Sequence, residues 1–153
     1  MLLVNCLVFE VAEQELAVIQ EVKSKSITFD TLHLLMAEDN DVNSLVLGKI
    51  IKKWGFTYDR VLNGLEAIEA VKNNSYDCIL MDIQMPEMDG FEATTEIKKF
   101  SDIPVIALTA AAKLEIMEKI DACGFEGFVA KPIDAAELLK KIKEVITEKN
   151  YKA

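Results

Sequence analysis

Five side chains that could do chemistry each stand at the end of a short apolar run in the sequence. Glu38 and Asp39 follow one run, and Asp82, Thr109 and Lys131 close or follow three later ones. Taken singly, each has an ordinary explanation as a helix cap, a strand-end hydroxyl or a solvated charge. If the runs are parallel strands, all five side chains converge at one edge of a sheet, where open α/β sheets bind ligands.

The chemistry predicted at that edge is phosphoryl transfer assisted by a metal ion. Three carboxylates that face one another repel, which raises their pKa values and destabilises the fold. A divalent cation removes that penalty, and ligands that are all oxygen atoms favour Mg²⁺. A carboxylate beside Mg²⁺ can hold a phosphoryl group as an acyl phosphate. Lys131 and Thr109 can then supply a counter-charge and a hydrogen bond to the phosphoryl oxygens.

The elements that must position these residues alternate strictly between strands and helices. Strands are predicted over residues 32–37, 56–62, 77–82, 103–108 and 125–130. Helical spacing follows each of them, at 42–54, around 65–71, at 91–100, at 113–123 and from 134 to 145. This alternation predicts an α/β fold, in which a five-stranded parallel sheet carries helices on both faces. We expect one such domain over residues 31–150.

Several local features of these helices are predicted from spacing and residue type. Asn40 or Asp41 is expected to cap the first helix, Gly55 to end it, and Asn63-Gly64 to form a turn. The first helix carries Val42, Leu45, Val46 and Ile50 on one face, and the fourth is expected to turn Leu114, Met117 and Ile120 inward.

Composition argues against several classes of function. The chain has 153 residues and a formal net charge of −9, which argues against direct nucleic-acid binding because that needs clustered Lys and Arg. Cys6, Cys78 and Cys123 are isolated in sequence and His33 is the sole histidine, so we expect no zinc site. We interpret the cysteines as reduced thiols in a cytoplasmic setting and His33 as a structural residue.

Residues 1–30 are interpreted as an N-terminal extension, or as a linker from an upstream module. Residues 2–9 could form a strand and residues 11–25 have helical spacing. The first nine residues are too short to span a membrane and lack the basic start of a signal peptide, so we expect no membrane segment in this chain.

Over residues 32–149, the sequence resembles the response-regulator receiver domain of two-component signalling. Five motifs carry the resemblance, in this order: Ala37-Glu38-Asp39-Asn40, Leu80-Met81-Asp82, Met85-Pro86-Glu87-Met88-Asp89-Gly90, Ala107-Leu108-Thr109-Ala110 and Lys131-Pro132. The joint match is specific, and it looks most like the receivers of hybrid histidine kinases. The resemblance implies a flavodoxin-like, doubly wound fold.

The resemblance also implies a role for each site residue. Asp82 is the implied phosphoacceptor, and Mg²⁺ is implied to be held by Asp39 directly, by Glu38 through water, by Asp82 and by the backbone carbonyl of Gln84. Thr109 is the implied switch hydroxyl, and Lys131 its partner in contacting the phosphoryl group, with a cis Lys131-Pro132 bond. Phe128 occupies the position of the switch aromatic and has no hydroxyl to donate.

We therefore expect a receiver that takes a phosphoryl group from a phosphohistidine onto Asp82 and then changes conformation. The expected partners are a histidine kinase, a histidine phosphotransfer protein or both, and the expected state is a monomer or weak dimer. Such a domain is no conventional enzyme, since it phosphorylates itself and loses the group slowly. The chain can be a stand-alone receiver or a fragment of a hybrid histidine kinase.

Three alternatives are less well supported by the sequence. A pseudo-receiver would dock to a partner without phosphorylation, but the acidic, hydroxyl and amine residues are all present. A flavin or nucleotide enzyme of the same topology would need a glycine-rich phosphate loop after the first strand. A phosphatase of the haloacid dehalogenase type would need an aspartate where Gln84 stands.

Overall fold

Five parallel strands form a central sheet in the computed structural model, which describes residues 31–111 and 113–152. The strands are β1 (His33–Ala37), β2 (Thr57–Val61), β3 (Cys78–Asp82), β4 (Val105–Thr109) and β5 (Gly127–Ala130), in the spatial order β2-β1-β3-β4-β5. The predicted parallel sheet is confirmed. The strand and helix expected within residues 1–30 lie outside the described residues.

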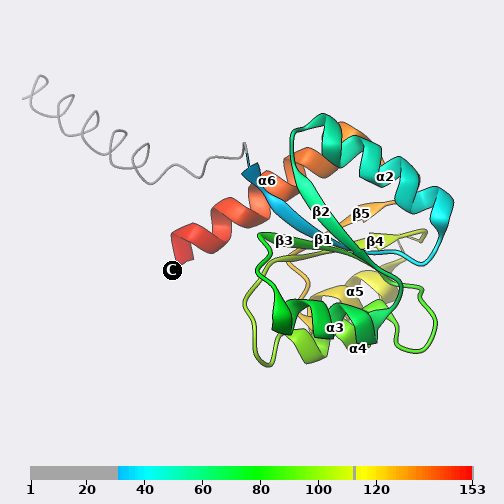
Figure 1. The fold of residues 1–153 in the computed structure, drawn as a ribbon. Helices are drawn as coiled ribbons and strands as arrows, with labels where there is room; N and C mark the ends of the chain where they lie inside the picture. Colours follow the sequence, from blue (N-terminus) through cyan, green and yellow to red (C-terminus); the bar gives the residue numbers. More distant parts are fainter. Residues whose placement is uncertain (1–30, 112, 153) are drawn as a thin grey trace, which may run out of the picture.

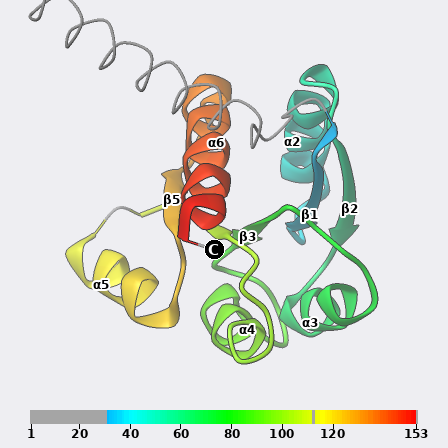
Figure 2. The same cartoon turned by 90° about the vertical axis from the view of Figure 1, so that its left-hand side faces the viewer.

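Helices cover both faces of this sheet. One face is covered by α2 (Asp41–Lys53) and α6 (Ala135–Lys152). The other face is covered by α3 (Gly64–Asn73), α4 (Gly90–Ile97) and α5 (Leu114–Cys123) (Figures 1 and 2). All residues of β3 and β4 are buried, because these strands have helices on both sides and neighbours on both edges. None of the helices in the described part of the chain is long and apolar enough to cross a membrane.

The chain changes direction in the sheet between β1 and β3. From β1 it passes through α2 to the edge strand β2, and it then returns across the sheet to β3. The helix that follows β1 and the helix that follows β3 lie on opposite faces. Their first turns therefore separate at the carboxyl ends of these two strands, which is the place where doubly wound sheets form a ligand crevice.

Four helices begin with a polar side chain that accepts a backbone hydrogen bond. The residues are Asn40 before α2, Asn63 before α3, Asp89 before α4 and Asp134 before α6, each 2.9 Å from the N–H donor three residues later. These caps satisfy N–H groups that have no partner within the helix. Asn63-Gly64, predicted as the turn after β2, supplies the N-cap and the first residue of α3.

The apolar face predicted on α2 is largely exposed. Val42, Leu45 and Val46 are 69%, 60% and 53% exposed, while Leu47 and Ile51 of the same helix are buried in the core. Spacing alone does not show which of two apolar stripes faces the sheet.

The prediction that Leu114 points inward on α5 is wrong, since it is exposed whereas Ile120 is buried. At about 100° per residue, six residues place Leu114 about 120° around the helix from Ile120, so the two cannot share a face.

Candidate functional site

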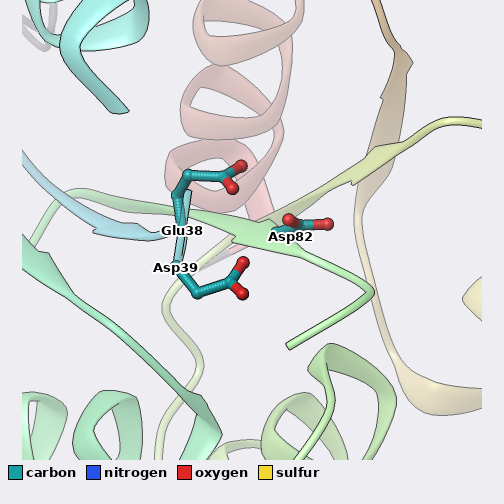
Figure 3. A group of neighbouring side chains, drawn as sticks. All are labelled: Glu38, Asp39 and Asp82. Atoms are coloured by element: carbon teal, nitrogen blue, oxygen red, sulfur yellow. The ribbon is translucent and has the colours of Figure 1, made fainter. Parts of the chain in front are cut away.

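Three carboxylates meet at the carboxyl ends of β1 and β3. Glu38 and Asp39 directly follow β1, and Asp82 is the last residue of β3 (Figure 3). Each offers one carboxylate oxygen that lies within 4.8 Å of those of the other two. Asp39 is exposed, but only 1% of Glu38 and 5% of Asp82 is accessible to solvent. Two of the three charges are thus withdrawn from water, which is costly unless a partner compensates for them.

The position of Asp82 depends on the loop that follows it. The Gln84 N–H donates to Asp82 Oδ1 at 3.1 Å, and the Gly90 N–H donates to the Ile83 carbonyl at 2.9 Å. A Cβ atom at Gly90 would overlap the Asp82 carbonyl oxygen and lie 3.0 Å from Ile83 Cα. Glycine is therefore required at the start of α4, because the loop folds back against the backbone that carries Asp82.

Lys131 brings one positive charge to the three carboxylates. Its Nζ lies 3.1 Å from Asp82 Oδ2 and 3.2 Å from Glu38 Oε2, and its backbone N–H donates to the Thr109 carbonyl at 2.7 Å. The Lys131-Pro132 peptide bond is cis, as expected. With all groups ionised, three carboxylates and one ammonium leave two negative charges at the site. A single divalent cation carries the charge that balances them.

Burial and the excess of negative charge act together on the pKa values of Glu38 and Lys131. Burial raises the pKa of Glu38, and the Asp82 charge raises it further, against the hydrogen bond from Asn40 and the charge of Lys131. Burial would lower the pKa of Lys131, but its hydrogen bonds and charge interactions with Asp82 and Glu38 raise it overall. The ammonium form of Lys131 is therefore the one that this site favours.

Thr109 and Gln84 line the same cleft as the carboxylates. This cleft has a volume of about 330 Å³ and is bordered by Glu38, Asp39, Asp82, Gln84, Thr109 and Lys131. The buried Thr109 hydroxyl donates to the Ala111 carbonyl at 2.9 Å and accepts the Ala111 N–H at 3.2 Å. It is thus engaged with its own loop. Phe128, on the neighbouring strand β5, is half-buried against the core cluster between the sheet and α3, α4 and α5.

Arg60 is a residue of this site that was not predicted from the sequence. It lies on β2, and its guanidinium donates to the backbone carbonyls of Glu38 (Nε, 3.0 Å) and Asp39 (Nη2, 3.2 Å). Its Nη2 also lies 3.0 Å from Asp41 Oδ1. Since Arg60 is the only arginine in the sequence, its residue type was a usable signal. The pairing of β1 with β2 was needed to place it.

The cluster meets the chemical requirements of a magnesium site. Mg²⁺ binds oxygen ligands at about 2.0–2.1 Å in octahedral geometry, so its ligand oxygens lie about 3–4 Å from one another. The carboxylate oxygens lie within 4.8 Å of one another, so a small adjustment would bring them to this spacing. One side of the cluster opens to the cleft, where water can complete the coordination. The excess of two negative charges is a second, independent reason for a divalent ion.

Comparisons with known proteins agree on one family. A model of the family "Response regulator receiver domain" matches residues 34–143. Hybrid signal transduction histidine kinase B of Dictyostelium discoideum is 42% identical over 120 residues, which cover 69% of this chain and 6% of that protein. The chain thus spans a small part of the length of such relatives.

Two solved structures are similar in both fold and sequence. The receiver domain of sensor histidine kinase PA1611 from Pseudomonas aeruginosa PAO1, which has magnesium in its active site cleft, is 33% identical with a TM-score of 0.72. The match covers 76% of this chain and 98% of that one. The second is a Saccharomyces cerevisiae complex of the histidine phosphotransfer protein Ypd1 with the Ssk1 receiver domain. It is 28% identical with a TM-score of 0.74, covering 81% and 94% of the two chains.

Proposed function

This chain belongs to the response regulator receiver domain family, and on that basis we propose that Asp82 accepts a phosphoryl group from a phosphohistidine. The observation that carries the proposal is the buried Asp82 carboxylate, held between Lys131 and two further acids at the floor of a cleft. Asp82 would attack phosphorus through one carboxylate oxygen. The new P–O bond replaces the P–N bond, and the imidazole keeps the electron pair of the bond that breaks.

We propose that the site holds Mg²⁺ through Glu38, Asp39, Asp82 and the backbone carbonyl of Gln84. When bound, the ion offsets negative charge on the transferring group and on the carboxylates around it. The support is the spacing of the three carboxylates, their excess of negative charge and the magnesium in the similar receiver domain of PA1611.

Lys131 and Thr109 would contact the phosphoryl group once it is on Asp82. Lys131 Nζ already lies 3.1 Å from Asp82, so its ammonium can pair with a phosphoryl oxygen after a small movement. The Thr109 hydroxyl can exchange its bonds to Ala111 for one to the phosphoryl group. That exchange would move the loop between β4 and α5, and Phe128 on the adjacent strand would repack. We propose α5, β5 and α6 as the surface that carries this change to a partner.

The proposed partner is a protein that bears the phosphohistidine, either a kinase or a phosphotransfer protein. The similar Ssk1 receiver binds a phosphotransfer protein, which supports this class of partner. A second hollow shares Glu38 and Lys131 with the site and is lined by Val46, Ile50 and Ile133. Exposed apolar side chains of α2 thus adjoin the cleft, and we place the donor against them.

The setting proposed for this reaction is the cytoplasm. The free thiols of Cys78 and Cys123 agree with it, since thiols persist where the medium is reducing.

The test is incubation with acetyl phosphate and Mg²⁺, followed by mass spectrometry of the intact chain. We expect the unmodified chain to gain one phosphoryl group, and Asp82→Asn to gain none. Asp89→Asn is the matched control, because Asp89 caps α4 outside the cleft, and it should be phosphorylated like the unmodified chain. Chelation of Mg²⁺ should stop the reaction. If the unmodified chain stays unphosphorylated, or Asp82→Asn gains the group equally, the proposal is wrong and the docking-only pseudo-receiver gains support.

A further inference from the structure

We propose that Arg60 is a positioning residue that holds Glu38 and Asp39 at the spacing a divalent cation needs. This inference rests on the proposed magnesium site, but it concerns a residue on a different strand. Arg60 pairs in register with Met36 of β1, two residues before Glu38, and its side chain extends past the end of that strand. No carboxylate or hydroxyl group is supplied by Arg60, so its action on the metal would be indirect.

The contacts of Arg60 fix the backbone from which two of the proposed ligands project. Nε and Nη2 of one planar guanidinium bind two successive carbonyls, at Glu38 (3.0 Å) and Asp39 (3.2 Å). The Glu38 N–H donates to the Val61 carbonyl at 3.1 Å, so the main chain of β2 holds the backbone of the same residue as well. With both peptide planes fixed, the directions of the Glu38 and Asp39 side chains are restricted. Groups that orient metal ligands in this way typically account for about 10- to 100-fold in metal affinity.

The ion pair of Arg60 with Asp41 does not explain why the guanidinium lies against the Glu38 and Asp39 carbonyls. The Asp41 side chain is 90% exposed, and exposed ion pairs contribute little to stability. The two carbonyl contacts use the fork geometry of a guanidinium, which a lysine ammonium cannot reproduce. The side chain of Arg60 is 27% exposed, so the contacts form partly away from water.

Charge and geometry make opposite predictions for Arg60, which allows them to be separated. A positive charge beside the site repels a cation, so charge alone would weaken Mg²⁺ binding. Geometry alone would strengthen it. The proposal states that geometry outweighs repulsion. Arg60→Lys keeps the positive charge but loses the planar pair of N–H donors that bind the two carbonyls. Arg60→Gln loses both the positive charge and this pair of donors.

The experiment is calorimetric titration of the metal-free full chain and its variants with Mg²⁺. We expect Arg60→Lys to bind Mg²⁺ about 10-fold more weakly, and Arg60→Gln to be weakened less because it also removes the repulsion. Asp41→Asn, which keeps both carbonyl contacts, should change affinity less than Arg60→Lys. Urea unfolding of each variant shows whether it is folded.

Four results would overturn the inference. Tighter binding by Arg60→Gln with Arg60→Lys unchanged would show that only charge matters. Unchanged affinity in both, with lower stability, would show a purely structural role. An equal loss in Asp41→Asn and Arg60→Lys would assign the effect to the ion pair. Absence of any Mg²⁺ binding by the unmodified chain would also refute it.

Phosphorylation by acetyl phosphate separates this inference from the proposed function. If Arg60 acts through the metal, raising the Mg²⁺ concentration should restore phosphorylation of Arg60→Lys to the level of the unmodified chain. A phosphorylation defect in Arg60→Lys that persists at saturating Mg²⁺ would contradict action through metal affinity. If the unmodified chain binds Mg²⁺ but is never phosphorylated, the proposed function fails while the calorimetric result for Arg60 still decides the positioning role.

Discussion

The two edges of the sheet differ in whether their charged side chains are matched by partners. At the carboxyl edge, Glu38, Asp39 and Asp82 share one ammonium, that of Lys131, and negative charge remains in excess. At the amino edge, two networks of side chains from different elements satisfy the charged groups Asp59, Lys98 and Glu126 with hydrogen-bonding partners. The comparison indicates that the amino edge stabilises the fold, whereas the carboxyl edge can still bind a positively charged ligand.

One network at the amino edge joins β1, β2 and the residues before β3. The Tyr76 hydroxyl donates to Asp59 Oδ2 at 2.7 Å, and His33 Nε2 lies 3.3 Å from the same oxygen. The other ring nitrogen of His33 lies 2.7 Å from the Thr57 hydroxyl, and the His33 backbone N–H donates to Asp77 at 2.8 Å. His33 is thus a structural residue that links neighbouring strands, as predicted.

A second network at this edge joins α4 to β4 and β5. Glu126 pairs with the ammonium of Lys98 and also accepts the Val105 N–H at 2.6 Å. Lys98 donates in addition to the Ile103 carbonyl at 2.8 Å. Both oxygens of Glu126 therefore have donors, and the charges of the pair cancel. Removing a carboxylate charge should consequently have opposite effects at the two edges.

The largest effect is expected for Glu126→Gln, which should lower the free energy of unfolding by about 2 kcal/mol. The substitution preserves shape but leaves the ammonium of Lys98, whose side chain is 19% exposed, without its counter-charge. Urea unfolding of the metal-free chain at pH 7 measures the change, with the single tryptophan, Trp54, as the fluorescent reporter. An unchanged midpoint would show that the amino edge does not depend on this charge balance.

The same substitution at the other edge, Glu38→Gln, should raise the free energy of unfolding by about 1 kcal/mol in the absence of metal. Burial and the Asp82 charge raise the pKa of Glu38 above its ordinary 4.5, so the folded chain holds that proton more tightly than the unfolded chain. The contribution of Glu38 to the stability of the unmodified chain therefore falls as pH rises from about 4.5 through the raised pKa. Glutamine does not ionise, so Glu38→Gln does not lose stability in this way as pH rises.

Urea unfolding of Glu38→Gln at pH 7 and again below pH 4.5 tests that explanation. The gain should be present at pH 7 and largely vanish at the acidic pH, where Glu38 is protonated in both states. Destabilisation at pH 7 would mean that the carboxyl edge is balanced after all, and the contrast between the edges would fail.

The smallest effect is expected for Tyr76→Phe, about 0.5 kcal/mol of lost stability at pH 7, since water can replace the phenol at the half-exposed Asp59. Burial, and then the hydrogen bond and charge of Asp59, raise the pKa of Tyr76 above its ordinary 10.0. The stability contributed by the phenol is complete below pH 10 and is lost as pH rises toward the raised pKa. The difference between the two proteins should therefore narrow above pH 10 in urea titrations. A constant gap would contradict that linkage.

Much of the fold was predictable because its signals are local. Apolar runs, helical spacing and capping residues such as Asn40 and Asp134 depend on neighbours a few positions away, and they gave the correct elements in the correct order. Parallel strands must also end at one edge, which is why the strand-end positions of Glu38, Asp82, Thr109 and Lys131 were enough to predict that these residues share a cleft.

Other features required the folded chain because they depend on distant partners. α2 has two apolar stripes, and only packing on the sheet decides that Leu47 and Ile51 are buried and Val42 and Leu45 are not. Leu114 and Ile120 cannot share a face of α5, and only packing shows that Ile120 is the one that is buried.

The sequence by itself therefore determined which acids, hydroxyl and amine lie at the carboxyl edge. The tertiary structure decided which contacts hold these groups in place. Lys131 reaches Glu38 across 93 residues, and Arg60 reaches the same loop across 22. Neither contact leaves a local pattern, because strand order and side-chain reach, set by the whole sheet, create both. For the same reason the pairing of Lys98 with Glu126 at the amino edge and the excess of negative charge at the carboxyl edge appear only once the strands are side by side.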